Sequence, residues 1–274
     1  MSKVILVILD AFGFEASTKR SGFLEHLTES GKCAKYKILG DLPSASRPMY
    51  ETIMTGLPVW QHGISSNGII RSSRCENLFS LTKKNGLVNA AAAYSWMYEL
   101  YCSGKPFSVH QDRYALESSG SIMHGIYYCE DYYPDSHLYA DAEFLRRMYC
   151  PDFLVIHPMN VDFAGHKFGA ASREYAHAGN MTMDQIAQLY ESWIKDGYEL
   201  IVTADHGMDE LGHHGGNEPI QRCTPLFIVS DKVAPGNYTN EEITTCIIAP
   251  LVCHLLNIAP AEGMIRPNAI HGIV

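Results

Sequence analysis

The sequence predicts a doubly wound α/β fold, in which a mostly parallel sheet carries helices on both faces and a small inserted cap. Short, continuously apolar runs alternate with stretches of helical periodicity along most of the chain. Strands that are apolar on both faces are typical of parallel sheets, because helices cover both sides of such sheets. The 274 residues, 46% of them hydrophobic, suit one large domain with an insertion.

The expected elements follow one another in a regular order. Apolar runs predict strands at residues 4–9, 87–94, 153–156, 199–204 and 226–229. Helical periodicity predicts helices at an apolar face formed by Phe23, Leu24 and Leu27, and around residues 139–149, 172–195 and 241–256. Together they indicate the strand–helix–strand units of a doubly wound sheet.

This alternation is lost between residues 94 and 138, where aromatic residues are dense. We expect one domain over residues 1–274, with residues 95–138 inserted in it as a cap. The string YYCEDYYPD within this cap offers rings that stack on a nucleotide base or sugar, or that pack a small core of their own. Packing is the more common role of aromatic side chains.

Charge and composition exclude several classes of partner. The formal net charge is -9, so no basic field attracts a polynucleotide or an anionic membrane. The apolar run at residues 4–9 is shorter than a signal peptide, and no stretch approaches the roughly 20 apolar residues of a membrane helix. The eight cysteines contain no CxxC pair, which indicates reduced thiols. These features predict a cytoplasmic protein, and they leave the oligomeric state open.

Three carboxylates stand at or just after the ends of predicted strands. Asp10 ends the first run, Asp162 follows the third after a short loop, and Asp205 ends the fourth. Ligands of open α/β sheets bind beyond the carboxyl ends of the strands. A single acidic residue there is usually a helix cap or loop residue, but three together favour a shared site.

Histidines accompany these carboxylates. His166 lies four residues after Asp162, His206 directly follows Asp205, and the string GHHGG holds His213 and His214. Carboxylate oxygens and neutral imidazoles are the ligands of zinc and related divalent ions. The pattern therefore predicts a metal site.

Residues 44–56 read as a loop that enters a short helix, with Pro48 near its start and Gly56 at its end. Ser46 lies just before the first turn. A helix N-terminus attracts phosphate and lowers the cost of forming an alkoxide. Ser44 or Ser46 is therefore either a nucleophile or an ordinary capping residue.

Together, these segments resemble the alkaline phosphatase superfamily and, within it, the type I phosphodiesterase and nucleotide pyrophosphatase branch. The most specific strings are SRPMYETIMTGLPVWQHGI, DFAGHKFG, and TADHGM followed by GHHGG, in this order. The resemblance covers nearly the whole chain except the aromatic segment, and it implies an alkaline phosphatase-like fold.

The resemblance also implies roles for individual residues. One metal ion is expected at Asp162, His166 and His214, and a second at Asp10, Asp205 and His206. Ser46 is expected to be the covalent nucleophile beside the second ion. His214 is preferred to His213 because the family places its ligand directly before glycine, although adjacent histidines leave the choice open.

Two further residues are expected at the substrate. The family's asparagine corresponds to Asn67, which is expected to contact a phosphoryl oxygen, although Asn67-Gly68 is also a good turn signal. Arg47 stands where many diesterase relatives carry an apolar or aromatic residue. It either faces the phosphate, which would favour a monoester, or is solvated.

The resulting prediction is a two-metal phosphoester hydrolase, most closely a phosphodiesterase or nucleotide pyrophosphatase, that forms a phosphoserine intermediate. Two divalent ions are expected, zinc or alternatively manganese, with a small phosphoester, such as a nucleotide, as the substrate. A phosphomonoesterase, phosphonate hydrolase or phosphomutase of the same superfamily is the alternative. A metal-binding scaffold without turnover is the alternative from another class.

Overall fold

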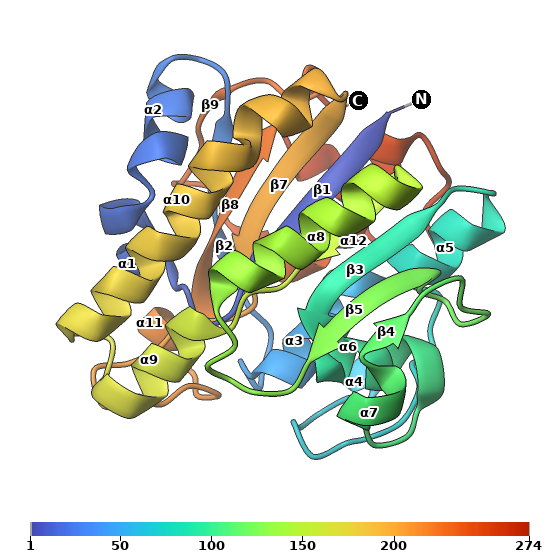
Figure 1. Ribbon diagram of the computed structural model, residues 1–274. Helices are drawn as coiled ribbons and strands as arrows, with labels where there is room; N and C mark the ends of the chain where they lie inside the picture. Colours follow the sequence, from blue (N-terminus) through green and yellow to red (C-terminus); the bar gives the residue numbers. More distant parts are fainter. Residues whose placement is uncertain (1, 274) are drawn as a thin grey trace.

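A computed structural model describes residues 2–273 and confirms the mostly parallel α/β fold (Figure 1). Its strands form one sheet: β1 (Lys3–Leu9), β2 (Ala34–Leu39), β3 (Asn89–Tyr94), β4 (Tyr114–Ala115), β5 (His124–Tyr128), β6 (Phe153–Ile156), β7 (Tyr198–Ala204), β8 (Cys223–Val229), β9 (Gly236–Asn237) and β10 (Ile243–Thr244). Their order is β10-β2-β8-β7-β1-β6-β3-β5-β4, with β9 beside β2.

The centre of the sheet is parallel. Strands β7, β1, β6, β3 and β5 all run in the same direction. Strand β8 runs antiparallel to both β2 and β7, and β4 runs antiparallel to β5. Because parallel strands end at the same edge, the loops after β1, β6 and β7 meet there.

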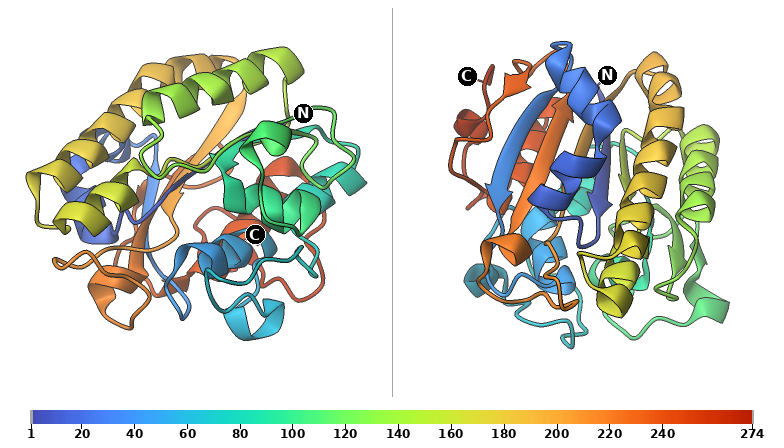
Figure 2. Two further views of the ribbon diagram at one scale, coloured as in Figure 1. Left: turned by 60° about the horizontal axis from the view of Figure 1, so that its bottom comes forward. Right: turned by 90° about the vertical axis from the view of Figure 1, so that its left-hand side faces the viewer.

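Helices cover both faces of the sheet. In chain order they are α1 (Phe14–Arg20), α2 (Gly22–Glu29), α3 (Ser46–Thr55), α4 (Val59–His62), α5 (Leu78–Lys84), α6 (Ser95–Tyr98), the π-helix η1 (Glu99–Ser103), α7 (Val109–Asp112), α8 (Asp135–Tyr149), α9 (Asn160–Phe168), α10 (Arg173–Lys195), α11 (Pro219–Arg222), the 3-10 helix η2 (Thr245–Ile247), α12 (Ile248–Leu256) and the 3-10 helix η3 (Pro267–Ala269). The side view in Figure 2 shows α8 and α10 together on one side of the sheet.

Strand β1 shows how the sequence builds this arrangement. Val4, Leu6 and Ile8 pack in one core with side chains of α3, α5 and α12. The alternate residues of β1, including Ile5 and Val7, pack in a second core with α2, α8 and α10. Successive strand residues point to opposite faces, so a continuously apolar strand supplies both cores.

Strand β2 and the last helix are among the elements that differ from the prediction. Strand β2 was not predicted, because its sequence AKYKIL mixes lysines with apolar residues. The strand lies towards one side of the sheet, between β10 and β8. The last helix was predicted around residues 241–256, but α12 begins at Ile248. The residues before it pair as β10 with β2 and then form η2, so tertiary pairing overrides local helical periodicity there.

Part of the expected cap belongs to the sheet itself. Residues 95–138 include β4 and β5, which extend the sheet beyond β3. Within this segment the rings of Tyr98, Phe107 and Tyr127 pack against one another. The segment between β3 and β4 forms α6, η1 and α7, which we call the aromatic lobe (residues 95–113). The division of the chain into a domain and a cap stays a prediction.

Two further features concern the cysteines and the lengths of the helices. All eight cysteines are free thiols. Within the part of the chain that the structure describes, every helix is too short or too polar to span a bilayer.

Candidate active site

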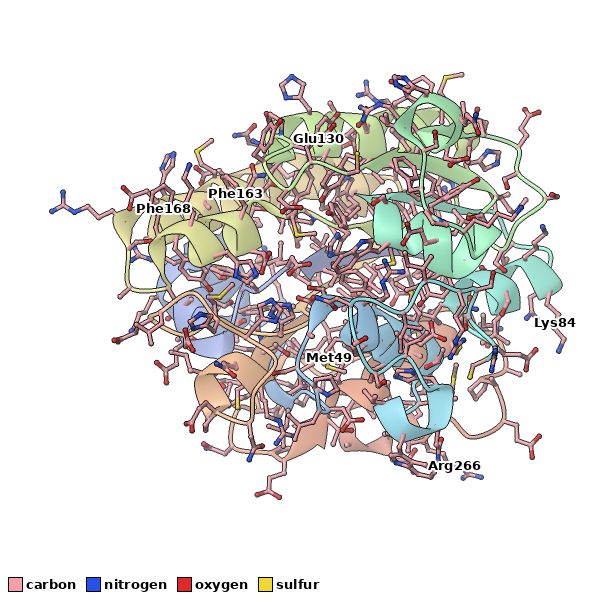
Figure 3. All side chains as sticks on the ribbon, turned by 90° about the horizontal axis from the view of Figure 1, so that it is seen from below. Met49, Lys84, Glu130, Phe163, Phe168 and Arg266 are labelled. Atoms are coloured by element: carbon pink, nitrogen blue, oxygen red, sulfur yellow. The ribbon has the colours of Figure 1, made fainter. Side chains whose placement is uncertain are left out.

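The predicted site residues converge at the carboxyl ends of the central strands. Asp10 directly follows β1, and Asp205 and His206 directly follow β7, its parallel neighbour. Asp162 and His166 lie on α9, which follows β6 on the other side of β1. Figure 3 views this edge from below, with Met49 of α3 near the middle and Phe163 and Phe168 of α9 to its left.

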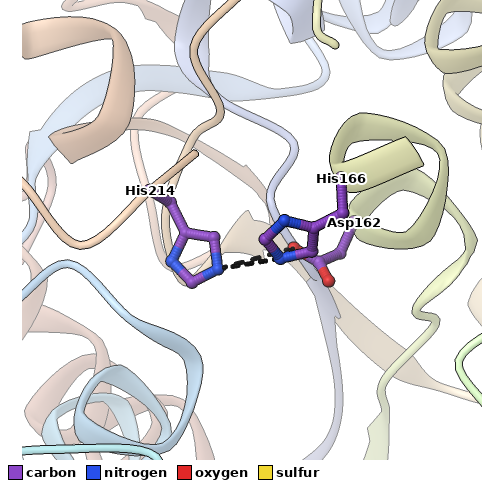
Figure 4. A group of neighbouring side chains, drawn as sticks. All are labelled: Asp162, His166 and His214. Atoms are coloured by element: carbon purple, nitrogen blue, oxygen red, sulfur yellow. Dashed lines mark hydrogen bonds and ion pairs between the residues drawn. The ribbon is translucent and has the colours of Figure 1, made fainter. Parts of the chain in front are cut away.

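The first group consists of Asp162, His166 and His214 (Figure 4). Helix α9 places Asp162 and His166 one turn apart, so both side chains lie on the same face. Nε2 of His166 lies 3.4 Å from Oδ1 of Asp162 and 3.2 Å from Nε2 of His214. The potential ligand atoms of the three residues lie within 4.8 Å of one another.

The second group consists of Asp10, Asp205 and His206, and all three side chains are fully buried. Nε2 of His206 lies 3.3 Å from Oδ1 of Asp10 and 3.4 Å from Oδ2 of Asp205. Asp10, Asp162 and His206 also have ligand atoms within 4.8 Å of one another, so the two groups adjoin. The structure thus brings together the six side chains that the resemblance assigned to two metal ions.

Three imidazoles share one hydrogen-bond pattern. The Nδ1 atoms of His166, His206 and His214 each lie 2.8–3.2 Å from a backbone carbonyl oxygen. These carbonyl groups belong to Gly212, Gly207 and Ser44, respectively. A carbonyl oxygen only accepts, so each Nδ1 carries a proton, and in the neutral ring Nε2 then presents a lone pair. Such backbone contacts are typical of metal-ligating histidines.

The carboxylates also fit a metal centre. Oδ1 of Asp10, Oδ1 of Asp162 and Oδ2 of Asp205 are buried and find no hydrogen-bond partner among residues 2–273. Burial raises the pKa of Asp162 and of Asp205 well above its usual range, and the charge of Asp10 raises both further. Burial, together with the neighbouring His214, lowers the pKa of His206 to about 3. Buried carboxylates beside neutral imidazoles need compensating positive charge, which divalent cations supply.

The adjacent histidines of GHHGG point in different directions. The His214 ring is stacked on that of His206 at a centroid distance of 3.9 Å, whereas the side chain of His213 is 72% exposed. Gly212 has a positive φ of 81°, and a Cβ atom there would lie 2.7 Å from the carbonyl oxygen of Gly165. The turn therefore requires glycine, and it directs His214 into the group.

Ser46 lies beside the second group. It is the first residue of α3, and its Oγ lies 3.1 Å from Nε2 of His206. Ala45 occupies the N-cap position and provides no side-chain cap. Ser44 donates its hydroxyl to the carbonyl oxygen of Gly216 instead. The structure therefore does not support the capping role that was the alternative for these serines.

Asn67 and Arg47 meet at the same helix start. Oδ1 of Asn67 accepts the backbone N–H of Arg47 at 3.0 Å, so the amide nitrogen of Asn67 remains available as a donor. The Arg47 side chain is 1% exposed and pairs with Glu99 at 2.5 Å. The solvated alternative for Arg47 is therefore not observed.

Two further residues of the site, His157 and Tyr50, were not predicted from the sequence. His157 follows β6, and its Nε2 lies 3.2 Å from Oδ2 of Asp10. Asp10, His157 and Asp205 form a further group of potential ligands. Tyr50 on α3 donates its hydroxyl to Oδ2 of Asp10 at 2.5 Å. The position of His157 directly after a buried strand was the signal that could have found it, whereas nothing local singles out Tyr50.

Comparison with known families agrees with this geometry. A family model described as type I phosphodiesterase / nucleotide pyrophosphatase matches residues 4–226. Among solved structures, human ectonucleotide pyrophosphatase / phosphodiesterase 5 superposes with a TM-score of 0.73 at 13% identity, over 95% of this chain and 96% of that chain. A phosphonate monoester hydrolase from Silicibacter pomeroyi gives a TM-score of 0.66 at 14% identity, over 97% of this chain and 75% of that chain. At these identities the superpositions show the fold.

Curated relatives include much longer proteins. The chain is 23% identical over 281 residues to GPI ethanolamine phosphate transferase 2 of Candida albicans, which covers 93% of this chain and 30% of that protein. It is 34% identical over 94 residues to GPI ethanolamine phosphate transferase 1 of Aspergillus oryzae, which covers 33% of this chain and 9% of that protein. The chain therefore spans less than a third of the length of these relatives.

These relatives contradict the cytoplasmic location that the sequence predicted. They are named as GPI ethanolamine phosphate transferases, and one of them matches nearly the whole chain. The prediction depended on the lack of a leader and a membrane helix in 274 residues. A chain that matches only part of longer proteins carries no such information about location.

Proposed function

Because the chain belongs to the type I phosphodiesterase / nucleotide pyrophosphatase family, we propose that it cleaves small phosphodiesters through Ser46 as a covalent nucleophile. One observation carries the proposal: Oγ of Ser46, at the first residue of α3, lies 3.1 Å from Nε2 of His206, beside buried carboxylates that each have one oxygen without a hydrogen-bond partner among residues 2–273. A hydroxyl group at a helix N-terminus, beside a site that fits cations, is suited to attack phosphorus.

Two divalent ions would be held by the side chains of the two groups. Asp162, His166 and His214 would hold one, and Asp10, Asp205 and His206 the other, with His157 beside Asp10. When bound, the ions would supply the positive charge that stabilises the attacking and leaving oxygens. Zinc suits this mixed oxygen and nitrogen set, and manganese is the alternative.

The protein's own groups orient the reaction. Oγ of Ser46 gives up its proton and forms a bond to phosphorus while the bond from phosphorus to the leaving oxygen breaks, and the leaving oxygen takes up a proton to become an alcohol, so that no net proton is gained or lost. The free N–H group of Asn67 donates to a non-bridging oxygen, since its carbonyl oxygen is held by Arg47. A water molecule then breaks the Oγ–P bond and returns Ser46 to its hydroxyl form.

A second candidate function differs from the first only in the last step, in which the phosphoryl group leaves Ser46. The curated relatives are named as ethanolamine phosphate transferases, so the group on Ser46 would pass to an alcohol of an acceptor instead of water. In both functions the first substrate is a phosphodiester. The alternatives of a phosphomonoesterase, phosphonate hydrolase or phosphomutase differ in the first substrate.

The test uses the metal-reconstituted protein and two chromogenic esters. We expect a higher kcat/KM for bis-p-nitrophenyl phosphate than for p-nitrophenyl phosphate. Added ethanolamine or glycerol that appears in the product as a new phosphodiester would identify a transferase. The reverse ester preference would support a monoesterase. Metal binding without turnover of either ester would favour the scaffold and refute the proposal.

A further inference from the structure

Arg47 directly follows the proposed nucleophile, yet its guanidinium group is turned into the protein. Nη2 of Arg47 pairs with Oε2 of Glu99 at 2.5 Å, and the two residues are 1% and 5% exposed. Glu99 begins the π-helix η1 in the aromatic lobe. Short π-helical turns are frequent at functional sites. The pair therefore connects the start of α3 to a segment 52 residues further along the chain.

The aromatic lobe holds Arg47 from two sides. The guanidinium group lies over the half-buried ring of Trp96, 4.7 Å from its centroid. The second oxygen of Glu99 accepts the backbone N–H of Phe107 at 2.9 Å, which fixes the carboxylate within the lobe. We call Arg47, Trp96 and Glu99 the arginine clasp. A buried ion pair of this kind requires accurate geometry, because each charge is costly without the other.

A second buried contact lies one turn along α3. Glu51 is fully buried and accepts hydrogen bonds from the hydroxyl groups of Tyr101, at 2.8 Å, and Ser73, at 2.5 Å. Residues 47 and 51 are four apart and share one face of the helix. That face of α3 is therefore attached to the lobe at two points.

The attached helix carries the groups that the proposed reaction needs. Ser46 precedes Arg47, and the backbone N–H of Arg47 holds Oδ1 of Asn67. Tyr50, which is also on α3, donates to Asp10. A small rotation of α3 would move the nucleophile, the Asn67 contact and the Asp10 contact together, and such displacements reduce rates strongly.

We propose that Glu99 and Trp96 are positioning residues, which hold the side chain of Arg47 and thereby the orientation of Ser46 and Asn67. This inference rests on the proposed function of Ser46. The competing role for Arg47 is direct contact with the phosphate, since its Nε and Nη1 atoms find no partner among residues 2–273. The two roles predict different responses to the removal of Glu99.

The experiment uses Glu99→Gln, Trp96→Phe, Arg47→Met and the double variant Arg47→Met/Glu99→Leu. The matched control is Glu76→Gln, because Glu76 forms an exposed pair with Lys84, with side chains 47% and 70% exposed. Each metal-loaded protein is assayed for kcat and KM with bis-p-nitrophenyl phosphate. Hydrogen exchange of the peptide over residues 43–56 is measured in parallel.

If the clasp positions α3, Glu99→Gln lowers kcat about tenfold or more while KM changes less than about twofold, as expected for displaced catalytic groups. Exchange in residues 43–56 becomes faster, and the control behaves as wild type. The double variant recovers activity relative to Glu99→Gln, because it leaves no unpaired buried charge. Trp96→Phe keeps a ring under Arg47 and retains most of the activity.

Two outcomes would overturn the inference. One is a normal kcat and normal exchange in Glu99→Gln. The other is a rise in KM confined to the variants that lack Arg47, which would assign Arg47 to the phosphate. If wild type shows no turnover but Glu99→Gln still increases exchange in residues 43–56, the proposed function fails and the clasp stands. If Glu99→Gln does not fold, Arg47→Met decides: a lower kcat with an unchanged KM and faster exchange in residues 43–56 supports the inference, and a normal kcat with normal exchange overturns it.

Discussion

Replacing Ser46 with alanine removes a single oxygen atom from the candidate active site. The side chain is 4% exposed, and its contact is with Nε2 of His206 at 3.1 Å. Loss of one buried hydrogen bond lowers the free energy of unfolding by about 1 kcal/mol, which corresponds to a decrease in Tm of about 2–4 °C for a chain of this size. The six proposed ligands keep their side chains, so metal content should not change.

Ser44 offers a matched control two residues away. Its side chain is also buried, and it also makes one hydrogen bond, to the carbonyl oxygen of Gly216 at 2.9 Å. Ser44→Ala should therefore lower Tm by a similar amount. Only Ser46→Ala removes the nucleophile, and its kcat should fall by about 10³-fold or more.

The assay combines metal content, thermal unfolding and kcat with bis-p-nitrophenyl phosphate for both variants. Intact-mass analysis of the quenched wild-type enzyme should show an adduct that is absent from Ser46→Ala. A kcat of Ser46→Ala within about tenfold of wild type would refute the assignment of the nucleophile. Equal losses of kcat in the two variants would refute it as well, since the shared effect would then be structural.

Three further predictions concern the metal centre and stability. His214→Ala should lower bound metal below that of wild type, whereas His213→Ala should not, as measured by elemental analysis; equal metal content would contradict the choice of His214. Removal of metal with a chelator should abolish hydrolysis, and added zinc or manganese should restore it; hydrolysis that persists in metal-free protein would contradict a metal-dependent reaction. Burial raises the pKa of Asp135 from 3.8 to about 7, so the folded state retains a proton that the unfolded chain releases. Stability should therefore fall as pH rises from about 4 to about 7, by up to about 4 kcal/mol in total, and Asp135→Asn should remove this part of the pH dependence in urea unfolding. An unchanged pH dependence in Asp135→Asn would show that the carboxyl group is ionised in the folded protein.

Much of the fold could be predicted because the central strands are recognisable from local sequence. Strands β1, β6 and β7 are short, mostly apolar runs, and the predicted bounds differ from the observed ones by at most one residue. Strand β2 was missed because its identity as a strand depends on pairing with β8, which lies far away in the sequence. Local periodicity does not report such pairing.

The order of residues along the chain determined the chemistry that this protein can support. A carboxylate after each of two parallel strands, and a third on the helix after their neighbour, must meet at one edge of the sheet. The histidines beside them and the serine at a helix start follow from local spacing alone. These patterns predicted a metal site and a serine near a helix start, whereas the division of the ligand side chains into two groups and the choice of Ser46 came from the resemblance to the phosphodiesterase family.

Only the tertiary structure decided how these groups are held. The choice between His213 and His214, the contact of His157 with Asp10, and the pairing of Arg47 with Glu99 all depend on which distant segments pack together. The sequence does not tell which of two neighbouring residues in a turn faces a site. The backbone conformation of the turn decides this, because it directs only one of the two side chains inward. Arg47 and Glu99 are 52 residues apart, and no local pattern reports a contact across that separation. Their pairing exists because the aromatic lobe packs on the first turn of α3, where burial makes an unpaired charge too costly.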